Sequence, residues 1–170
     1  MVYPIVKYGT AVLEQVAAPV TEFDEKLRQL VEDMFESMVA AQGVGLAAPQ
    51  IGLSLQLAVI DITTGKDPQA RLVLANPEIL AAEGMQREEE GCLSLPGFHA
   101  EVRRPRRVTV RAQDATGRSF TLTREDLLAR AFCHEIDHLR GKLFISHLSM
   151  LKRDSIRRKV RKLVRAGEWQ

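Results

Sequence analysis

The segment His134-Glu135-Ile136-Asp137-His138 constrains what this chain can fold into more than any other stretch. Residues four apart lie on one face of an α-helix, so a helix here lets both imidazoles reach a single ion. Apolar residues at helical spacing predict this helix over 124–140, with Thr123 able to cap its start and Gly141 ending it. Because apolar residues line two of its faces, we expect the helix to be buried.

The glutamate inside this motif indicates a catalytic metal site. Glu135 follows the first histidine and is not needed as a ligand, which is where a general base for a metal-bound water belongs. A chance match at this spacing is rare in a chain with four histidines. We therefore predict that His134 and His138 bind one divalent ion and that Glu135 acts as the base.

Two histidines leave a catalytic site one protein ligand short, and the metalloprotease patterns do not supply it. One such pattern needs a further histidine where Phe144 stands, although Gly141 fits it. Another needs a downstream glutamate, and Glu168 lies in a Glu-Trp-Gln segment that makes a poor buried ligand. Cys133 is favoured as a pocket wall or core thiol. The candidates that remain open are Cys92, Cys133, His99 and, beyond the helix, His147.

The remaining pattern predicts an α+β fold of short, mostly antiparallel strands around the central motif helix, with a C-terminal helix. The assignments rest on apolar periodicity and on glycine and proline positions. In chain order we expect an arm over 1–20, a helix over 24–41, a loop over 43–52, strands over 55–62 and 71–75, the latter ended by Asn76-Pro77, a hairpin of 107–113 with 118–123, and a last helix over 149–166.

Composition fits one globular domain over residues 1–170, and the metal motif makes this domain a candidate catalytic one. The chain is 45% hydrophobic and 27% charged, and no apolar run reaches the roughly 18–20 residues of a membrane span. Its start lacks the basic and apolar segments of a secretory signal, so the expected compartment is the cytoplasm. Two cysteines exclude a disulfide scaffold. No long apolar helix is left without a partner, so we expect a monomer.

Charge is segregated along the chain. Residues 151–170 hold eight Lys and Arg against two acidic residues, a net charge of +6. The other residues hold 16 basic and 20 acidic side chains, a net charge of −4, and the total of +2 conceals the difference. A basic helix over 151–166 can bind a phosphate backbone by charge, or it can simply be a solvated amphipathic helix.

Three motifs of this chain resemble those of the bacterial peptide deformylases. They are Gly43-Val44-Gly45-Leu46-Ala47-Ala48-Pro49-Gln50, then Glu90-Gly91-Cys92-Leu93-Ser94, then the His-Glu-x-x-His segment described above. Their order is that of the family, and no defining position is substituted. The resemblance covers nearly the whole chain.

The resemblance implies that Cys92, His134 and His138 are the three protein ligands, with water or hydroxide as the fourth. A thiolate lowers the net charge of a divalent site to about +1 and suits Fe²⁺, Zn²⁺, Ni²⁺ or Co²⁺ better than Mg²⁺ or Ca²⁺. Members of the family typically work with Fe²⁺ and lose activity on oxidation, as expected of an exposed thiolate on redox-active iron. We therefore expect one Fe²⁺ per chain in the cell.

The implied reaction is hydrolysis of the N-terminal formyl group of formyl-methionyl nascent peptides, with release of formate. Glu135 would take the proton of the metal-bound water as the water attacks the formyl carbon, and would pass it to the leaving amine. Family roles place the Gln50 side-chain amide and the Leu93 backbone N–H on the formyl oxygen. A deformylase acts on chains leaving the ribosome, so ribosomal RNA is a sensible partner for the basic helix 151–166.

Two parts of the chain are expected to contact the substrate. Glycines allow close approach of an extended peptide, so Val44 and Gly45 are predicted to contact it. Leu127 and Ala131 lie on the histidine stripe of the helix and are placed to line an apolar methionine pocket. Arg130 is expected either to lay its stem along the rim of this pocket or to be solvated.

Two acidic residues are expected to support the site. Asp137 points away from its neighbouring histidines, and we predict that it pairs with Arg104. Glu90 is expected to orient the cysteine loop, although the run Glu88–Glu90 would by default be a solvated face.

Two other functions remain open at this point. One is a metallopeptidase that cleaves internal peptide bonds, which would need a third histidine or glutamate ligand that the chain lacks at the usual positions. The other is a structural-metal module that binds ribosomal RNA through the basic helix. A structural site would be closed by four protein ligands and would not need Glu135.

Overall fold

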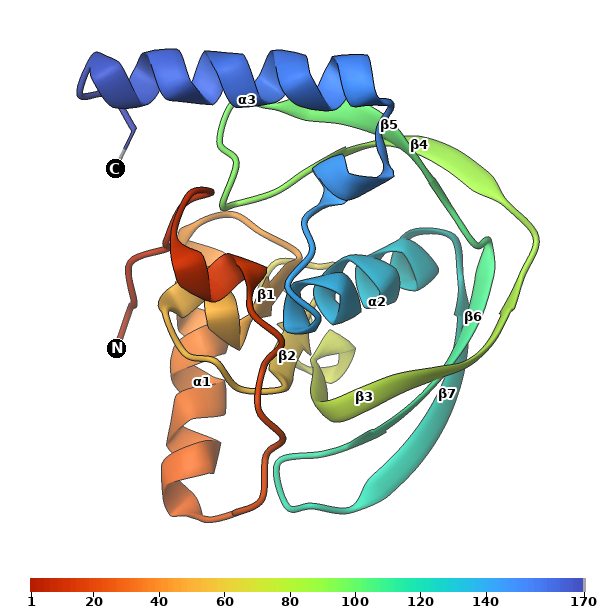
Figure 1. Cartoon of the computed structure of the whole chain (residues 1–170). Coiled ribbons are helices and arrows are strands. Elements are labelled where there is room, and N and C mark those ends of the chain that lie inside the picture. Colours follow the sequence, from red (N-terminus) through yellow and green to blue (C-terminus); the bar gives the residue numbers. More distant parts are fainter. Residues whose placement is uncertain (170) are drawn as a thin grey trace.

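The computed structural model describes residues 1–169 and confirms a mixed α+β fold (Figure 1). The α-helices of this part of the chain are α1 (Glu25–Ala40), α2 (Asp126–Leu139) and α3 (Met150–Arg165). Its strands are β1 (Gly45–Ala47), β2 (Leu57–Ile60), β3 (Leu72–Glu83), β4 (Gln86–Gly91), β5 (His99–Arg104), β6 (Arg107–Gln113) and β7 (Ser119–Glu125). Short 3-10 helices span Ala11–Glu14, Ala48–Ile51, Pro68–Ala70 and Phe144–His147.

The strands form two antiparallel sheets. The larger has the order β1-β2-β3-β6-β7, and the smaller is the pair β4-β5. Among the described strands, β1 therefore has one unpaired edge, and so does β4. Helix α2 runs through the middle of the molecule between β1 on one side and the long strands β6 and β7 on the other (Figure 1). The motif helix is thus enclosed by strands, as its two apolar faces predict.

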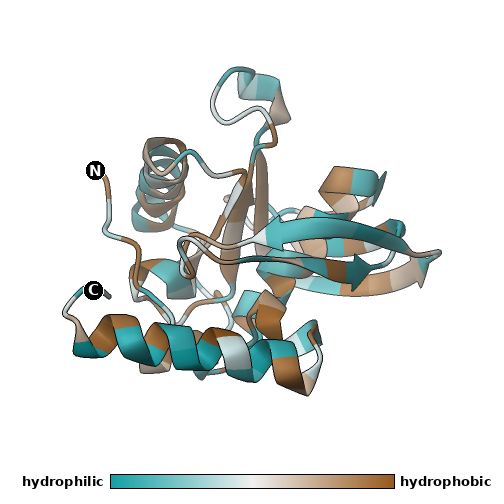
Figure 2. Ribbon diagram, turned by 90° about the horizontal axis from the view of Figure 1, so that it is seen from above, coloured by the Kyte–Doolittle hydropathy of each residue, from teal (hydrophilic) through white to brown (hydrophobic). Residues whose placement is uncertain are grey.

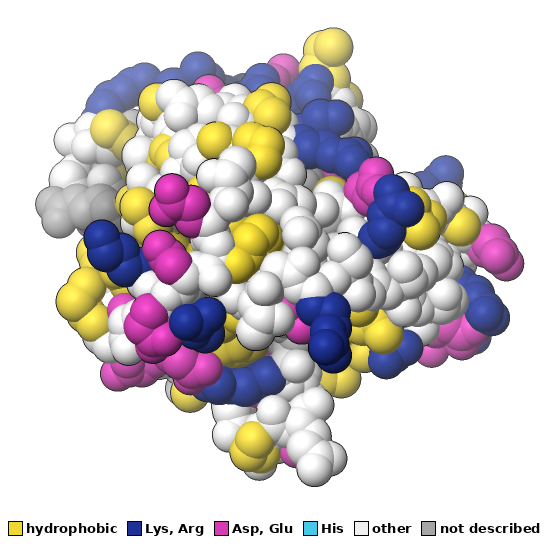
Figure 3. All heavy atoms as spheres, turned by 90° about the horizontal axis from the view of Figure 1, so that it is seen from below, with side chains coloured by type: hydrophobic (Ala, Val, Ile, Leu, Met, Phe, Trp, Pro, Cys, Tyr) yellow, Lys and Arg dark blue, Asp and Glu magenta, His cyan; other side chains and the backbone are white. Residues whose placement is uncertain are grey.

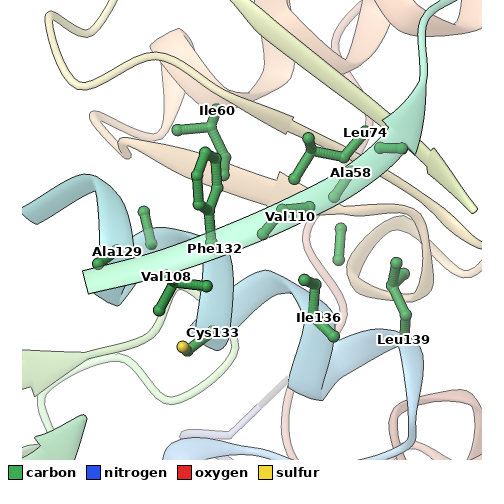
Figure 4. Packing of buried hydrophobic residues seen from close by; sticks show 13 residues of the cluster. Ala58, Ile60, Leu74, Val108, Val110, Ala129, Phe132, Cys133, Ile136 and Leu139 are labelled. Atoms are coloured by element: carbon green, nitrogen blue, oxygen red, sulfur yellow. The ribbon is translucent and has the colours of Figure 1, made fainter. Parts of the chain in front are cut away.

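Packing around α2 explains why the helix is central. Phe132 and Ile136 point into the core and meet Val108 and Val110 of β6, while Ile60 of β2 closes the same cluster (Figure 4). Each of these side chains is at most 2% exposed. Burying a side chain of this size contributes about 1.5–3 kcal/mol. The helix that carries the motif is therefore held in place by the core itself.

Strand β2 joins this core to a second one. Its residues alternate between the two, since Ala58 and Ile60 belong to the cluster around α2, whereas Leu57 and Val59 belong to the cluster around α1. Helix α1 begins where Asp24 accepts a hydrogen bond from the backbone N–H of Leu27 at 3.0 Å. The helix predicted over 24–41 is confirmed, and its buried face covers β1 and β2.

The prediction that Asn76-Pro77 ends a strand is wrong. Strand β3 continues to Glu83, and its pairing with β6 shifts register between Ala75 and Glu78. Pro77 falls inside this irregularity, where the ladder does not need its missing N–H. The side chain of Asn76 accepts from the N–H of Val20 and donates to the carbonyl oxygen of the same residue. Contacts distant in sequence thus carry the strand past a local turn signal.

Three further differences from the sequence prediction concern short elements. The predicted loop 43–52 contains β1 and a 3-10 turn, and β4 and β5 were not predicted at all. Thr123 does not cap α2, because it lies in β7 and its hydroxyl is hydrogen bonded to that of Thr109. Glu125 occupies the cap position without a side-chain capping bond. The hairpin of β6 and β7 is confirmed.

Helix α3 lies on the outside of the molecule, against β5 (Figure 1). Ser149 caps it, and Ile156 and Val160 pack into a third cluster with Leu95 and Val102. Hydrophilic and hydrophobic residues alternate along its ribbon, as in an amphipathic helix (Figure 2). The opposite face of the molecule carries acidic and basic side chains intermixed (Figure 3). None of the described helices is long and apolar enough to cross a membrane.

Candidate active site

Helix α2 and the segment after β4 bring three metal-binding side chains together. They are Cys92, His134 and His138, whose ligand atoms all lie within 4.8 Å of one another. The sulfur of Cys92 is 3.3 Å from Nε2 of His138, and the two imidazole centroids are 4.9 Å apart. The two histidines of α2 and the cysteine of the loop after β4 thus point to one common site.

The other candidates for a third ligand lie elsewhere. Cys133 is buried in the apolar core around α2, where burial raises the pKa of its thiol to about 11. The Nε2 atom of His147 lies 2.7 Å from Oδ2 of Asp137. His99 lies at the rim of the cleft against the backbone of Gly91. Among the described residues, Cys92 is the one that completes the histidine pair.

The charge of the cysteine suits a metal ligand. Burial alone would raise the pKa of Cys92, but the adjacent imidazoles of His138 and His134 outweigh it and lower this pKa to about 5. A thiolate with two imidazoles is a donor set for a borderline or soft divalent ion. In addition, the buried Oε1 of Glu135 has no hydrogen-bond partner. A water on a metal ion would satisfy this oxygen, so the residues present fit the ion that the donor set implies.

Glu90 lies beneath the histidines and fixes the orientation of one of them. Its Oε1 accepts from Nδ1 of His134 at 2.6 Å and from the guanidinium of Arg104 at 2.6 Å. Its Oε2 accepts from Arg130 at 2.5 Å and from Nε of Arg104 at 3.2 Å. Burial opposes ionisation of Glu90, but these hydrogen bonds and charges hold its pKa well below the usual range. A histidine whose Nδ1 donates in this way can offer the lone pair of its Nε2 to a metal ion.

The Glu90 network is the name we give to Glu90, Arg104, Arg130, Asp137 and His147. Arg104 donates to Oδ2 of Asp137 at 2.6 Å, so the two residues predicted to pair are in contact. Of the two positions expected for Arg130, the solvated one is wrong, because Arg130 is 6% exposed and also donates to the carbonyl of Val102 at 3.0 Å. Its side chain lines the same cleft as Leu127 and Ala131. Glu88 and Glu89 are exposed, as a solvated run would be, whereas Glu90 is not.

Gln50 is held so that its amide NH₂ faces the cysteine. Its carbonyl oxygen accepts from the backbone N–H of Ala47 at 3.0 Å. Its Nε2 then donates to the hydroxyl of Ser94 at 3.2 Å and lies 3.6 Å from the sulfur of Cys92. Leu93, between these two residues, lines the same cleft. Gln50 and Leu93, whose N–H groups the family resemblance assigns to the formyl oxygen, are therefore adjacent to the candidate metal site.

A cleft of about 460 Å³ opens in front of these residues. The unpaired edges of β1 and β4 lie along it, since its wall includes Gly45 of β1, the preceding Val44, and Glu89 to Gly91 of β4. From α2, Leu127 and Ala131 line the cleft, Leu127 being half exposed and Ala131 buried. The cleft thus combines peptide backbone edges with an apolar helix face.

Two features of the site were missed from the sequence. The role of Arg130 was not foreseen, and neither was the tether from Glu90 to His134. The hydrogen bonds concerned join residues 40 and 44 positions apart. The one signal that hinted at them is Glu90 itself, an acidic residue next to the glycine before Cys92.

The family model, the curated relatives and the solved structures that match this chain all name one family. The sequence model described as polypeptide deformylase matches residues 2–154. The peptide deformylase of Acidobacterium capsulatum is 59% identical over 99% of both chains. The crystal structure of a peptide deformylase from Legionella pneumophila has a TM-score of 0.91 at 47% identity, covering 100% of this chain and 99% of the other. That from Thermus thermophilus has a TM-score of 0.88 at 47% identity, covering 96% of both chains.

Proposed function

Because this chain belongs to the polypeptide deformylase family, whose members are enzymes, we propose that it hydrolyses the N-terminal formyl group of formyl-methionyl nascent peptides. The products are formate and a peptide with a free amino group. The observation that carries the proposal is the pairing of the Cys92, His134 and His138 cluster with a buried glutamate whose Oε1 is free. Residues 1–170 would then act as one catalytic domain.

We propose that Cys92, His134 and His138 hold one divalent ion and that the protein groups around it move the proton and bind the substrate. The ion, when bound, would acidify a water molecule and polarise the formyl carbonyl. Glu135 takes the proton of the attacking water and returns it to the amide nitrogen as the bond from carbon to nitrogen breaks. Burial raises the pKa of Glu135, which suits a group that must both accept and release a proton.

Gln50 and Leu93 are proposed to bind the formyl oxygen. The NH₂ of Gln50 is neutral and is aimed at the site by the bond from Ala47 to its carbonyl oxygen. The backbone N–H of Leu93 would be the second donor. Donors fixed before the reaction stabilise the negative charge that develops on that oxygen without reorganising during the step.

The substrate peptide is proposed to lie in the cleft as an extended strand. The free edges of β1 and β4 supply backbone groups that can pair with such a chain, with Val44 and Gly45 on one side of it. Leu127 and Ala131 would then line the pocket of the methionine side chain. In this arrangement the formyl amide at the N-terminus of the peptide reaches the metal ligands and Glu135.

The identity of the ion and the partner of α3 are also proposals. A thiolate ligand favours Fe²⁺ in the cell, with Zn²⁺, Ni²⁺ or Co²⁺ able to replace it in purified protein. The basic outer face of α3, which includes Arg158, Arg161 and Arg165, is proposed to contact ribosomal RNA. We propose that the enzyme works as a monomer in the cytoplasm, where nascent chains are found.

A single set of assays tests the proposed function. Protein purified without oxygen is analysed for bound metal and then given a formyl-Met peptide, its acetylated analogue and a peptide with an internal bond only. We expect deformylation of the first alone, and its loss in Glu135→Ala with the metal retained. Unchanged deformylation in that variant would refute the role of Glu135, and cleavage of the internal bond would favour a metallopeptidase.

The proposed RNA contact is tested separately. Replacing Arg158, Arg161 and Arg165 with Gln removes three charges from the exposed face of α3. Binding to ribosomes at low salt should then weaken by tenfold or more, while activity on a free formyl-Met peptide stays unchanged. Ribosome binding that is absent in the original protein, or insensitive to salt, would end this part of the proposal.

A further inference from the structure

The carboxylate of Glu135 is held in an unusual way for a buried acidic group. The side chain is 4% exposed, and its Oε1 is buried without a hydrogen-bond partner. The hydrogen bonds of the described residues include none to this carboxylate. A general base needs free lone pairs, but a base without tethers must be positioned by something else. Packing against neighbouring atoms is the remaining means.

The neighbour that faces this carboxylate is the backbone of β1 at Gly45. A Cβ added at this position would lie 2.6 Å from Oε2 of Glu135, 3.0 Å from its Cδ and 3.2 Å from its Cγ. The first of these distances is far shorter than any carbon–oxygen contact between unbonded atoms. The carboxylate therefore occupies the space in which every other amino acid would place its side chain.

We propose that Gly45 is a positioning residue for Glu135, because its missing side chain forms the slot that holds the carboxylate toward the metal ligands. The inference rests on the proposed function in one respect only, namely that Glu135 is the base. It gives the second glycine of the Gly-Val-Gly segment a role different from the peptide contact predicted from the sequence.

The backbone conformation at Gly45 does not explain the glycine. Gly141 has a φ of +78° and ends α2, so a left-handed conformation requires glycine there. Gly45 is not among the residues with positive φ, and it lies in a regular antiparallel pair with Ile60. An alanine could adopt this backbone without strain. The requirement at Gly45 is therefore one of space.

Strand β1 cannot move away to make room for a side chain. Gly45 is paired with Ile60, and the preceding carbonyl, that of Val44, accepts from the N–H of Asp61 at 2.8 Å. Leu46 and Ala47 on the other side are fully buried. Because close-packed elements resist displacement, an added methyl group would move the end of the Glu135 side chain rather than the strand. A shift of about 1 Å in a catalytic group can cost roughly 100-fold in rate.

Kinetics of Gly45→Ala separate this proposal from a role in substrate contact. A misplaced base lowers kcat with little change in KM, since the substrate still binds. We expect kcat for a formyl-Met peptide to fall by about 100-fold and KM to change by less than about threefold. Metal content should stay at one ion per chain, because no ligand is displaced. A raised KM with unchanged kcat would overturn the proposal and leave Gly45 as a substrate contact only.

A stability cycle tests the same contact without any assay of activity. In the original chain, Gly45→Ala creates a clash and should lower the Tm by on the order of 5 °C. In a Glu135→Ala background the carboxylate is gone, so the same substitution should lower the Tm by less than about 1 °C. Glu135→Ala is thus the matched background for the substitution at Gly45.

Each outcome of this cycle either supports or overturns the contact between Gly45 and the Glu135 carboxylate. Folding of Gly45→Ala only in the Glu135→Ala background would support it strongly. Equal losses in both backgrounds, or failure to fold in both, would overturn it, because the glycine would then be needed for a reason unrelated to the carboxylate. The cycle measures the contact between position 45 and Glu135 through Tm alone, so it remains valid even if the deformylase assay of the proposed function fails.

Discussion

His134 and Glu135 are neighbours on α2, yet the protein holds them in opposite ways. The imidazole of His134 is fixed by a hydrogen bond of 2.6 Å to Glu90, itself bound by two arginines. The Oε1 of Glu135 is buried without a partner, and its carboxylate rests in the slot beside Gly45. A ligand gains from a directional bond that fixes its tautomer, whereas a base must keep its lone pairs for the substrate's proton.

The Glu90 network, which holds His134, and the surroundings of Glu135 are two regions that also differ in charge balance. In the Glu90 network the buried carboxylate of Glu90 and the partly buried carboxylate of Asp137 face two guanidinium groups, those of Arg104 and Arg130. Each charge in it is neutralised by a partner at hydrogen-bond distance, which offsets the cost of burial. Glu135 has no such partner, and burial raises its pKa. In one region, therefore, each charge has a partner, and in the other a buried charge without a partner is kept for chemistry.

The largest contrast should come from the same change made in both regions. Glu90→Gln keeps the shape of the side chain but leaves two buried arginines without their shared carboxylate. We expect it to lower the free energy of unfolding by about 3–5 kcal/mol. Glu135→Gln removes an unpaired buried charge, so the free energy of unfolding should stay the same or rise. Urea denaturation of the two variants measures both effects.

Metal affinity sharpens this first contrast. Loss of the tether on His134 should weaken metal binding by about 10–100-fold in Glu90→Gln, measured by competition with a chelator. Glu135→Gln should bind the metal as the original protein does, because no ligand or tether is changed. Equal destabilisation by the two substitutions, or an unaltered metal affinity in Glu90→Gln, would mean that the two regions are not built differently.

Arg130 gives the next largest effect, within the network alone. Arg130→Met removes one of the two guanidinium groups on Glu90, while Arg104 remains to hold it. We expect a loss of about 2–3 kcal/mol in the free energy of unfolding. Arg106→Met is the matched control, since Arg106 is 65% exposed and pairs with Asp126 at 3.5 Å on the surface. Its effect should stay within about 0.5 kcal/mol. Similar effects at both positions would contradict the assigned role of Arg130.

What the sequence could predict in these two regions depends on how local the signal is. The spacing of His134 and His138 is set within one turn of a helix, so the helix and the histidine pair follow from the sequence. The partners of Glu90 lie 14, 40 and 44 residues away, and nothing in a run of three glutamates tells which one will be buried. Burial of that one residue comes from side chains brought against it from elsewhere, Arg104 of β5 and Arg130 and His134 of α2.

The same reasoning accounts for the errors in the fold. A proline is a local signal, and at Pro77 it predicts the end of a strand. The sheet partner β6 resumes pairing at Glu78, and this long-range contact prevails over the local signal. Gly45 shows the converse case, since the sequence singles out this glycine but assigns it only to the substrate. Only the distance from its missing Cβ to Glu135 reveals the second constraint.

The pH dependence of stability should have opposite signs in the two regions. Burial by itself would raise the pKa of Glu90, but its hydrogen bonds to His134 and Arg104 outweigh burial and lower this pKa. Ionised Glu90 therefore stabilises the fold fully at pH values above the ordinary pKa near 4.5. This stabilisation is lost as the pH falls toward the lowered pKa. Burial raises the pKa of Glu135, so its ionisation costs stability as pH rises from near 4.5 through the raised value.

Thermal unfolding of the metal-free protein between pH 4 and 8 tests this opposition. Glu135→Gln should gain Tm over the original protein at neutral pH and lose that gain toward pH 4, where the original glutamate is protonated. Glu90→Gln should be less stable throughout this range, since Glu90 stays ionised in it. A gain for Glu135→Gln that grows toward acid pH would reverse the sign assigned to this carboxylate.

His147 should give the smallest effect, and it defines where the Glu90 network ends. Its ring lies 2.7 Å from the carboxylate of Asp137 and is 37% exposed, while Arg104 stays on the same carboxylate. His147→Asn should therefore cost only about 0.5–1 kcal/mol and change metal affinity by less than about threefold, by the same denaturation and chelator measurements. If it instead weakens metal binding as much as Glu90→Gln does, the tether on His134 extends to the surface of the protein. The contrast between a rigid ligand and an untethered base would then hold only while this exposed ring is in place.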